Sequence, residues 1–170
     1  MDVSIVQKIT IYAIPLIFAI TLHEAAHAFA ARYFGDSTAY MMGRMTLNPI
    51  KHIDPVWTIL VPLVTLLLPG GFVFGAAKPV PVNFGALRNP KRDSIWVAAA
   101  GPLANLAMMV AWAIIGKIAL SLGDSTPLQF LQYMAGAGIF VNALLMVFNL
   151  FPLLKKSAGN ARNLAPMTFE

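Results

Sequence analysis

The sequence predicts an all-α polytopic membrane protein with about four transmembrane or re-entrant helices and a short extended segment between the second and third. Of its 170 residues, 58% are hydrophobic and 11% are charged, whereas a soluble domain has roughly 25% charged residues. Four apolar stretches approach or exceed the roughly 20 residues that cross a bilayer. A compact soluble fold of this length cannot bury so much apolar surface, and a disordered chain has the opposite balance of residues.

The apolar stretches cover residues 9–34, 56–74, 95–122 and 128–154. The apolar part of the first is too long for a cleaved secretory signal, and no cleavage site follows it, so we interpret it as a retained helix. The second contains Pro-Gly-Gly at 69–71, which would break a helix. Part of this second stretch is therefore expected to be re-entrant and to lie against protein.

The segment 77–83, with the sequence AKPVPVN, follows the second apolar stretch. Its two prolines exclude a helix and favour an extended strand or sheet edge. Two roles stay open for it. It either pairs with an extended substrate by strand addition or forms a structural loop at the membrane surface.

Twelve Lys and Arg exceed seven Asp and Glu, and the chain has no cysteine. The basic residues are scattered between apolar runs and form no stripe of the kind that binds nucleic acid. They resemble the basic residues of membrane-protein loops, so the expected surroundings are a lipid bilayer and the expected partners include no nucleic acid. Without cysteine, a metal ion would need His, Asp, Glu or water as ligands.

His23, Glu24 and His27 form the motif H-E-x-x-H near the end of the first apolar stretch. Residues four apart lie on one helical face, so two imidazoles at this spacing can share a tetrahedral zinc ion at about 2.0–2.1 Å. Glu24 lies beside them, where it can orient a water molecule and accept its proton. The alternative is a set of polar residues on a helix surface, but ionisable groups at bilayer depth are costly and usually functional. The motif therefore predicts the site of a zinc metalloendopeptidase.

The chain carries, in this order, the motifs HEAAHAFAARYFGD, GRMTLNPIKHIDP, AKPVPVN, NPKRD, VAAAGPLANL and FNLFP, over about residues 23–152. Together they resemble the site-2 protease family of intramembrane zinc metalloproteases, of which the chain would be a short, single-domain member. The resemblance implies hydrolysis of peptide bonds in transmembrane protein substrates, with His23 and His27 as Zn²⁺ ligands and Glu24 as the base. It also implies a multi-pass integral membrane protein, and the absence of soluble domains fits a prokaryotic cell membrane.

Three further residues take candidate roles from the same resemblance. Asn105, in the motif GPLAN, would contact substrate or an oxyanion. It would equally serve as an interhelical hydrogen bond worth about 1–2 kcal/mol. His52 and Asp54 are candidates for an extra metal ligand, although a single loop histidine is usually solvated or caps a helix.

The C-terminal part departs from the family pattern. A catalytic zinc ion usually has three protein ligands, and in the family the third is an aspartate in a segment resembling N-x-F-P-x-P-P-L-D-G. Here this segment begins at Asn149, but no aspartate follows Asp124. We therefore divide the chain into a membrane-embedded metalloprotease-like domain, 1–154, and an atypical polar tail, 155–170, which reflects a frameshift, a truncation or natural divergence. The prediction is a metal centre impaired by the loss of its third ligand.

Three functional hypotheses follow. The first is an intramembrane zinc metalloprotease that cleaves transmembrane protein substrates. The second is a catalytically inactive homologue that binds membrane helices or acts as a scaffold. The third is a small transporter or channel subunit, but the sequence shows no inverted repeat of the kind that many transporters have.

Overall fold

The computed structural model describes residues 4–61, 64 and 77–162. Within these ranges no residue lies in a β-strand, so the predicted all-α class is confirmed. The elements, in chain order, are α1 (Ile5–Tyr33), α2 (Thr38–Met41), the short turns η1 (Pro49–Lys51), η2 (Pro55–Leu60) and η3 (Phe84–Ala86), α4 (Pro90–Ser121) and α5 (Thr126–Arg162).

In the described part of the chain, three helices are long and apolar enough to cross a membrane: Val6–Tyr33, Pro90–Ser121 and Thr126–Leu150. At about 1.5 Å per residue, each exceeds the roughly 30 Å of a hydrocarbon core. They correspond to the first, third and fourth predicted stretches. The second stretch, 56–74, begins in η2 and otherwise falls almost wholly outside the described residues.

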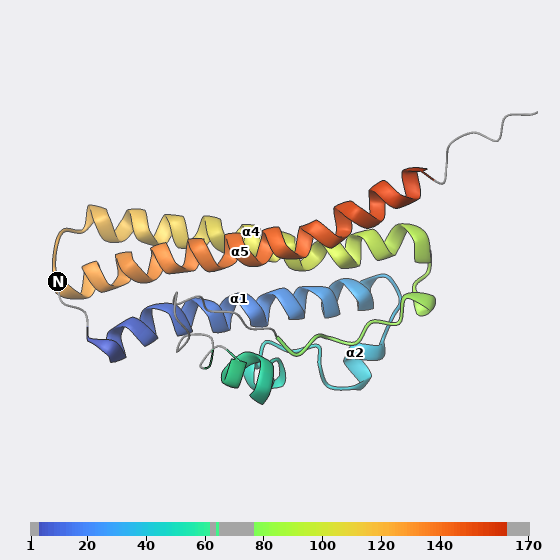
Figure 1. Ribbon diagram of the computed structural model, residues 1–170, viewed down its shortest axis with the longest axis horizontal. Helices are drawn as coiled ribbons and strands as arrows, with labels where there is room; N and C mark the ends of the chain where they lie inside the picture. Colours follow the sequence, from blue (N-terminus) through green and yellow to red (C-terminus); the bar gives the residue numbers. More distant parts are fainter. Residues whose placement is uncertain (1–3, 62–63, 65–76, 163–170) are drawn as a thin grey trace, which may run out of the picture.

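Helix α1 lies at the centre of the fold (Figure 1). On one side it packs against α4 and α5, which run side by side and are joined by a short loop. On its other side lie α2, η2 and the segment 77–83. Large apolar side chains on α4, among them Val110, Ile114 and Ile118, remain exposed at helical spacing, as expected of a surface that faces lipid rather than water.

The alanines on the second half of α1 let its neighbours approach closely. Ala28 and Ala31 are fully buried. Ala28 packs against Val80 of the segment 77–83, whereas Ala31 packs in a cluster with Val97 of α4. Small side chains at these positions therefore bring the extended segment and α4 close to the turns that carry His23 and His27.

The segment 77–83 lies in neither a helix nor a strand. Its backbone is held by the preceding loop. The Lys78 N–H donates to the His52 carbonyl at 3.0 Å, and Arg44 Nη2 donates to the Lys78 carbonyl at 2.9 Å. The segment 77–83 therefore lacks a helix, as expected from its prolines, but the strand or sheet edge predicted for it is wrong, because loop and side-chain groups hold its backbone in place of a strand ladder.

A buried carboxylate, Asp36, anchors the end of this segment. It accepts hydrogen bonds from the Asn83 N–H at 2.7 Å and from the Thr38 N–H at 2.9 Å, and also from the Thr38 hydroxyl. Burial alone would raise the pKa of Asp36, but these hydrogen bonds outweigh it and hold the pKa below its ordinary value of 3.8. Asp36 thereby ties the loop after α1 to the segment that passes Glu24.

We expect Asp36→Asn to lower the free energy of unfolding by about 1–3 kcal/mol, because it removes a charged acceptor from buried N–H groups. A lowered pKa means that the folded state keeps Asp36 ionised to a lower pH than the unfolded chain does. Its contribution is complete near neutral pH and decreases as the pH falls below 3.8. Thermal unfolding in detergent across this pH range measures both effects, and the variant should show a weaker acid dependence than the wild type. Equal acid dependence in the two proteins would contradict this assignment.

Helix α5 continues without interruption across residue 154 to Arg162. The division between a domain at 1–154 and a tail at 155–170 stays a prediction, since it concerns composition rather than helical structure.

Candidate metal centre

The two histidines of H-E-x-x-H point to one place. His23 and His27 lie one turn apart on α1, and their Nε2 atoms are 3.1 Å apart. Two nitrogens bound to one tetrahedral zinc ion at about 2.0–2.1 Å would be about 3.3 Å apart. The distance between the two Nε2 atoms in the structure is therefore close to the distance between two nitrogens that bind the same metal ion.

The other nitrogen of each ring faces an acceptor on α4. His23 Nδ1 lies 2.9 Å from Asn105 Oδ1, and His27 Nδ1 lies 2.7 Å from the Val97 carbonyl. With Nδ1 of each neutral ring donating, both Nε2 atoms carry lone pairs directed toward one another. Such lone pairs repel at 3.1 Å, and a cation between them relieves the repulsion. Histidine ligands of metals almost always have a partner of this kind on the second nitrogen.

Gly101 completes this side of the site. It lies on α4 midway between Val97 and Asn105, four residues from each, so all three face α1. A Cβ atom added at Gly101 would lie 2.5 Å from His23 Nε2 and closer still to His27 Nε2. A glycine here therefore leaves open the position that a metal ion bound to both nitrogens would take. On this evidence the residues fit two of the protein ligands of a zinc ion.

Glu24 follows His23 on α1 and contacts a different element. Its Oε2 accepts the Val80 N–H at 2.7 Å, and the side chain is 9% exposed. Successive residues on a helix differ by about 100° in direction, so the histidines meet α4 while Glu24 meets the segment 77–83. The Val80 N–H fixes one carboxylate oxygen and leaves the other available.

Asn105 is fully buried. Its side-chain oxygen faces His23 Nδ1. This contact joins α4 to α1, and it is the interhelical hydrogen bond that the sequence offered as one of two roles for Asn105. Its Nδ2 has no hydrogen-bond partner in the described part of the chain. A buried amide with a spare donor next to the two histidines can donate to a carbonyl oxygen that enters the site.

The model of peptidase family M50 matches residues 11–130. The chain belongs to peptidase family M50. This is the site-2 protease family that the motifs predict, and the matched range contains the paired histidines, Glu24 and Asn105.

Three curated relatives carry similar names. Putative zinc metalloprotease YwhC of Bacillus subtilis (strain 168) is 41% identical over 147 residues, which cover 82% of this chain and 62% of that protein. Putative zinc metalloprotease Rip2 of Mycolicibacterium smegmatis (strain ATCC 700084 / mc(2)155) is 32% identical over 138 residues, covering 81% of this chain and 50% of the relative. Rip2 of Mycobacterium tuberculosis (strain ATCC 25618 / H37Rv) is 30% identical over 141 residues, covering 79% and 49%. The chain thus spans between about half and 62% of the length of these relatives. No solved structure gives a significant match.

The two further ligand candidates in this M50 chain lie in the loop after α2. His52 is fully buried, and its Nε2 donates to the Thr46 carbonyl at 2.8 Å. Asp54 caps η2 by accepting the N–H groups of Val56 and Trp57, and these hydrogen bonds lower the pKa of its carboxyl. Across residues 4–61, 64 and 77–162, no three His, Asp or Glu side chains gather to hold a metal ion. A role for either residue as an extra ligand stays a prediction.

Three parts of the candidate site were not predicted from the sequence: the Val97 carbonyl, Gly101 and the Val80 N–H. Two of them are backbone groups, and the third acts through the absence of a side chain. The spacing of Val97, Gly101 and Asn105 in VAAAGPLAN is the signal that would have identified the α4 face, because residues four apart share one side of a helix.

Proposed function

We propose that the chain is an intramembrane zinc metalloprotease that hydrolyses peptide bonds of transmembrane protein substrates in a bacterial cell membrane. The observation that carries the proposal is the pair of facing Nε2 atoms, 3.1 Å apart on α1, with Glu24 beside them. The site lies in a helix long and apolar enough to span a membrane. Membership of family M50 and the names of the relatives support the same chemistry.

His23 and His27 would hold the zinc ion through Nε2, while Asn105 and the Val97 carbonyl orient the two rings. A bound zinc ion would supply Lewis-acid polarisation of the scissile carbonyl. The described residues bring two such ligands together, whereas catalytic zinc sites usually have three. We infer that zinc binds weakly to this pair alone and that full activity requires a further donor.

Glu24 is the group that moves the proton. As the oxygen of water bonds to the carbonyl carbon, the Glu24 carboxylate accepts a proton from that water. The C–N bond then breaks, and Glu24 returns the proton to the leaving nitrogen. General base catalysis of this kind contributes about 10²–10⁴-fold to a rate. The Val80 N–H, at 2.7 Å, holds the carboxylate in place during these transfers.

Asn105 supports the same step from α4. Its unpaired Nδ2 can donate to the carbonyl oxygen as negative charge develops there, the effect of an oxyanion-hole donor. A transmembrane substrate presents its carbonyls only where its helix is unwound, because a helix otherwise bonds them internally. We therefore expect cleavage at helix-destabilising residues.

Cleavage by the full chain in liposomes tests the proposal. The substrate is a single-span peptide of about 20 apolar residues with Gly and Pro at its centre, and products are identified by mass spectrometry. We expect slow cleavage that stops with a chelator and increases with added zinc, and loss of both zinc binding and cleavage in His23→Ala. Ser121→Ala is the control, because this exposed hydroxyl at the end of α4 donates to the Ile118 carbonyl of its own helix.

Each result of this experiment has a distinct meaning. Zinc binding without cleavage would favour the inactive homologue that binds membrane helices. Cleavage that survives His23→Ala would show that the paired histidines are not the metal centre.

A further inference from the structure

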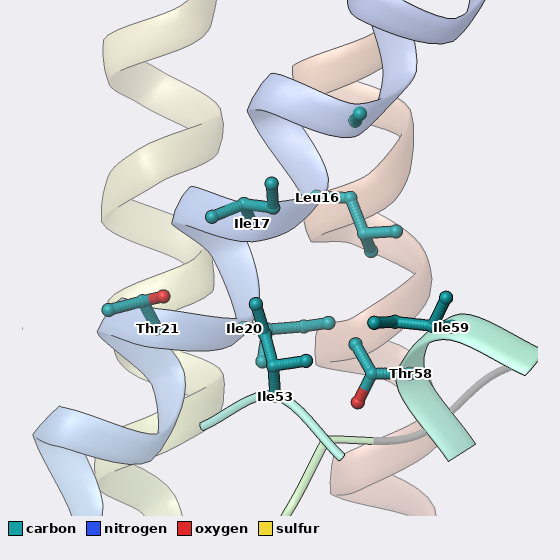
Figure 2. Close-up of a pocket in the computed structure, with 8 residues that line it drawn as sticks. Leu16, Ile17, Ile20, Thr21, Ile53, Thr58 and Ile59 are labelled. Atoms are coloured by element: carbon teal, nitrogen blue, oxygen red, sulfur yellow. The ribbon is translucent and has the colours of Figure 1, made fainter. Parts of the chain in front are cut away.

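A cavity of about 250 Å³ lies beside α1, on the side that faces the loop after α2. Figure 2 shows side chains of α1 facing those of the loop and η2 across it. Its lining is almost wholly apolar and includes Leu16, Ile17, Ile20, Ile53, Thr58 and Ile59. The Thr58 hydroxyl accepts the Asp54 N–H at 2.9 Å, so this polar group is engaged within its own loop.

The cavity is adjacent to the catalytic carboxylate. Ile20 precedes Glu24 by four residues on α1, so the two share a face one turn apart, about 5.4 Å along the axis. Helical side chains lean toward the N-terminus of the helix, which directs Glu24 toward the turn of Ile20. Ile53 lies on the opposite wall of the cavity, directly after His52 in the loop. The His52 carbonyl accepts a hydrogen bond from the Lys78 N–H, and Lys78 belongs to the segment 77–83, which also bonds Glu24. Both walls therefore belong to elements that also position the base.

We propose that this cavity is a specificity site that receives one large apolar side chain of the substrate, next to the bond that is cleaved. The proposal rests on the proposed function. An unwound substrate advances about 3.3 Å per residue and alternates its side chains between two sides. When a carbonyl lies at Glu24, a neighbouring side chain comes within reach of the cavity. A leucine or phenylalanine there would fill it, whereas glycine or alanine would leave a void without contacts.

A lipid acyl chain is the other apolar occupant that a bilayer offers. The inner wall favours the peptide, because Ile20 is 9% exposed and Thr21 is 5% exposed, so this end is enclosed beside the catalytic turn. The outer rim is open, with Ile59 50% exposed. The open rim admits either occupant, but a side chain whose backbone lies at Glu24 is also held next to the enclosed end, whereas a lipid chain has no such anchor there.

The test compares substrates and variants of the full chain in liposomes. The central peptide positions on each side of the cleaved bond carry Ala, Leu or Phe, one change at a time. We expect the wild type to cleave a Leu or Phe peptide at least about 10-fold more efficiently, as kcat/KM, than the Ala peptide at one position. Ile59→Trp, which fills the cavity, should abolish this preference. Ile114→Trp is the matched control, because Ile114 is similarly exposed on α4 and lies away from the cavity.

A second arm does not depend on cleavage. Glu24→Gln chains are mixed with the same peptide carrying photo-leucine at successive central positions, and adducts are mapped by mass spectrometry. We expect one position to label Ile20, Ile53 or Ile59, with loss of the adduct when Ile59→Trp is added. Adducts at the cavity without cleavage by the wild type would contradict the proposed function but support the peptide site.

Two results would overturn the specificity site. One is cleavage whose preference for Leu or Phe is unchanged by Ile59→Trp. The other is labelling of the cavity by a photoactivatable phosphatidylcholine in the presence of peptide, with no peptide adduct there, which would assign it to a lipid chain.

Discussion

Gly101→Ala is expected to abolish zinc binding while the helices remain folded. The added Cβ would lie 2.5 Å from His23 Nε2 and closer to His27 Nε2, in the space that a shared metal ion needs. The loss of affinity should exceed the about 10–100-fold that follows from removing a hydrogen-bond partner of a metal ligand. The zinc affinity, measured by titration of the purified protein with zinc, gives the result directly.

The control separates this effect from helix stability. Gly136 lies inside α5, and a Cβ atom there would meet nothing within 4 Å. Glycine to alanine inside a helix is ordinarily stabilising by roughly 1 kcal/mol, so Gly136→Ala should keep its zinc and unfold at the same or a higher temperature. Unchanged zinc content in Gly101→Ala would show that the histidines turn away from α4 when they bind metal.

Glu24→Gln is expected to lower cleavage by about 10²–10⁴-fold and to leave zinc binding intact. The glutamine oxygen can still accept the Val80 N–H, which lies 2.7 Å from the carboxylate in the wild type. The amide cannot accept the proton of water. The variant therefore keeps the local structure and loses one chemical step, which is measured as kcat on the single-span peptide alongside zinc per chain.

Asp124→Asn serves as the matched control, because it makes the same exchange at an exposed carboxylate between α4 and α5. It should cleave at the wild-type rate. If Glu24→Gln loses zinc together with cleavage, Glu24 supports the metal centre rather than moving a proton. Wild-type cleavage by Glu24→Gln would assign the base to another group.

The sequence was informative where side chains repeat with a helical period. The spacing of His23 and His27 on one apolar stretch predicts that their rings meet, and the facing Nε2 atoms agree. Three of the four predicted spans are also present, and these were predicted from the length of apolar runs rather than from their period. Each of these features is local, since it depends on residues within one helix.

Contacts between elements were beyond the sequence. The Val97 carbonyl and the Val80 N–H belong to backbone that every residue has, so no residue type marks them. Their roles depend on how α4 and the segment 77–83 align with α1, and small residues such as Ala28 and Ala31 decide this by how closely they let neighbours approach. The strand expected at 77–83 also depended on a partner strand, and here loop and side-chain groups take that place.

The backbone of residues 78–81 restricts how a substrate can be recognised there. The Lys78 N–H is bonded to the His52 carbonyl and the Val80 N–H to Glu24, while Pro79 and Pro81 have none to offer. An extended chain passing along this stretch finds no free donor, so it cannot form the alternating ladder that strand addition requires. A substrate that binds at these residues is therefore recognised through contacts with its side chains rather than through backbone hydrogen bonds. The exception is a substrate that replaces Glu24 as the partner of the Val80 N–H, which would release the carboxylate as the substrate binds.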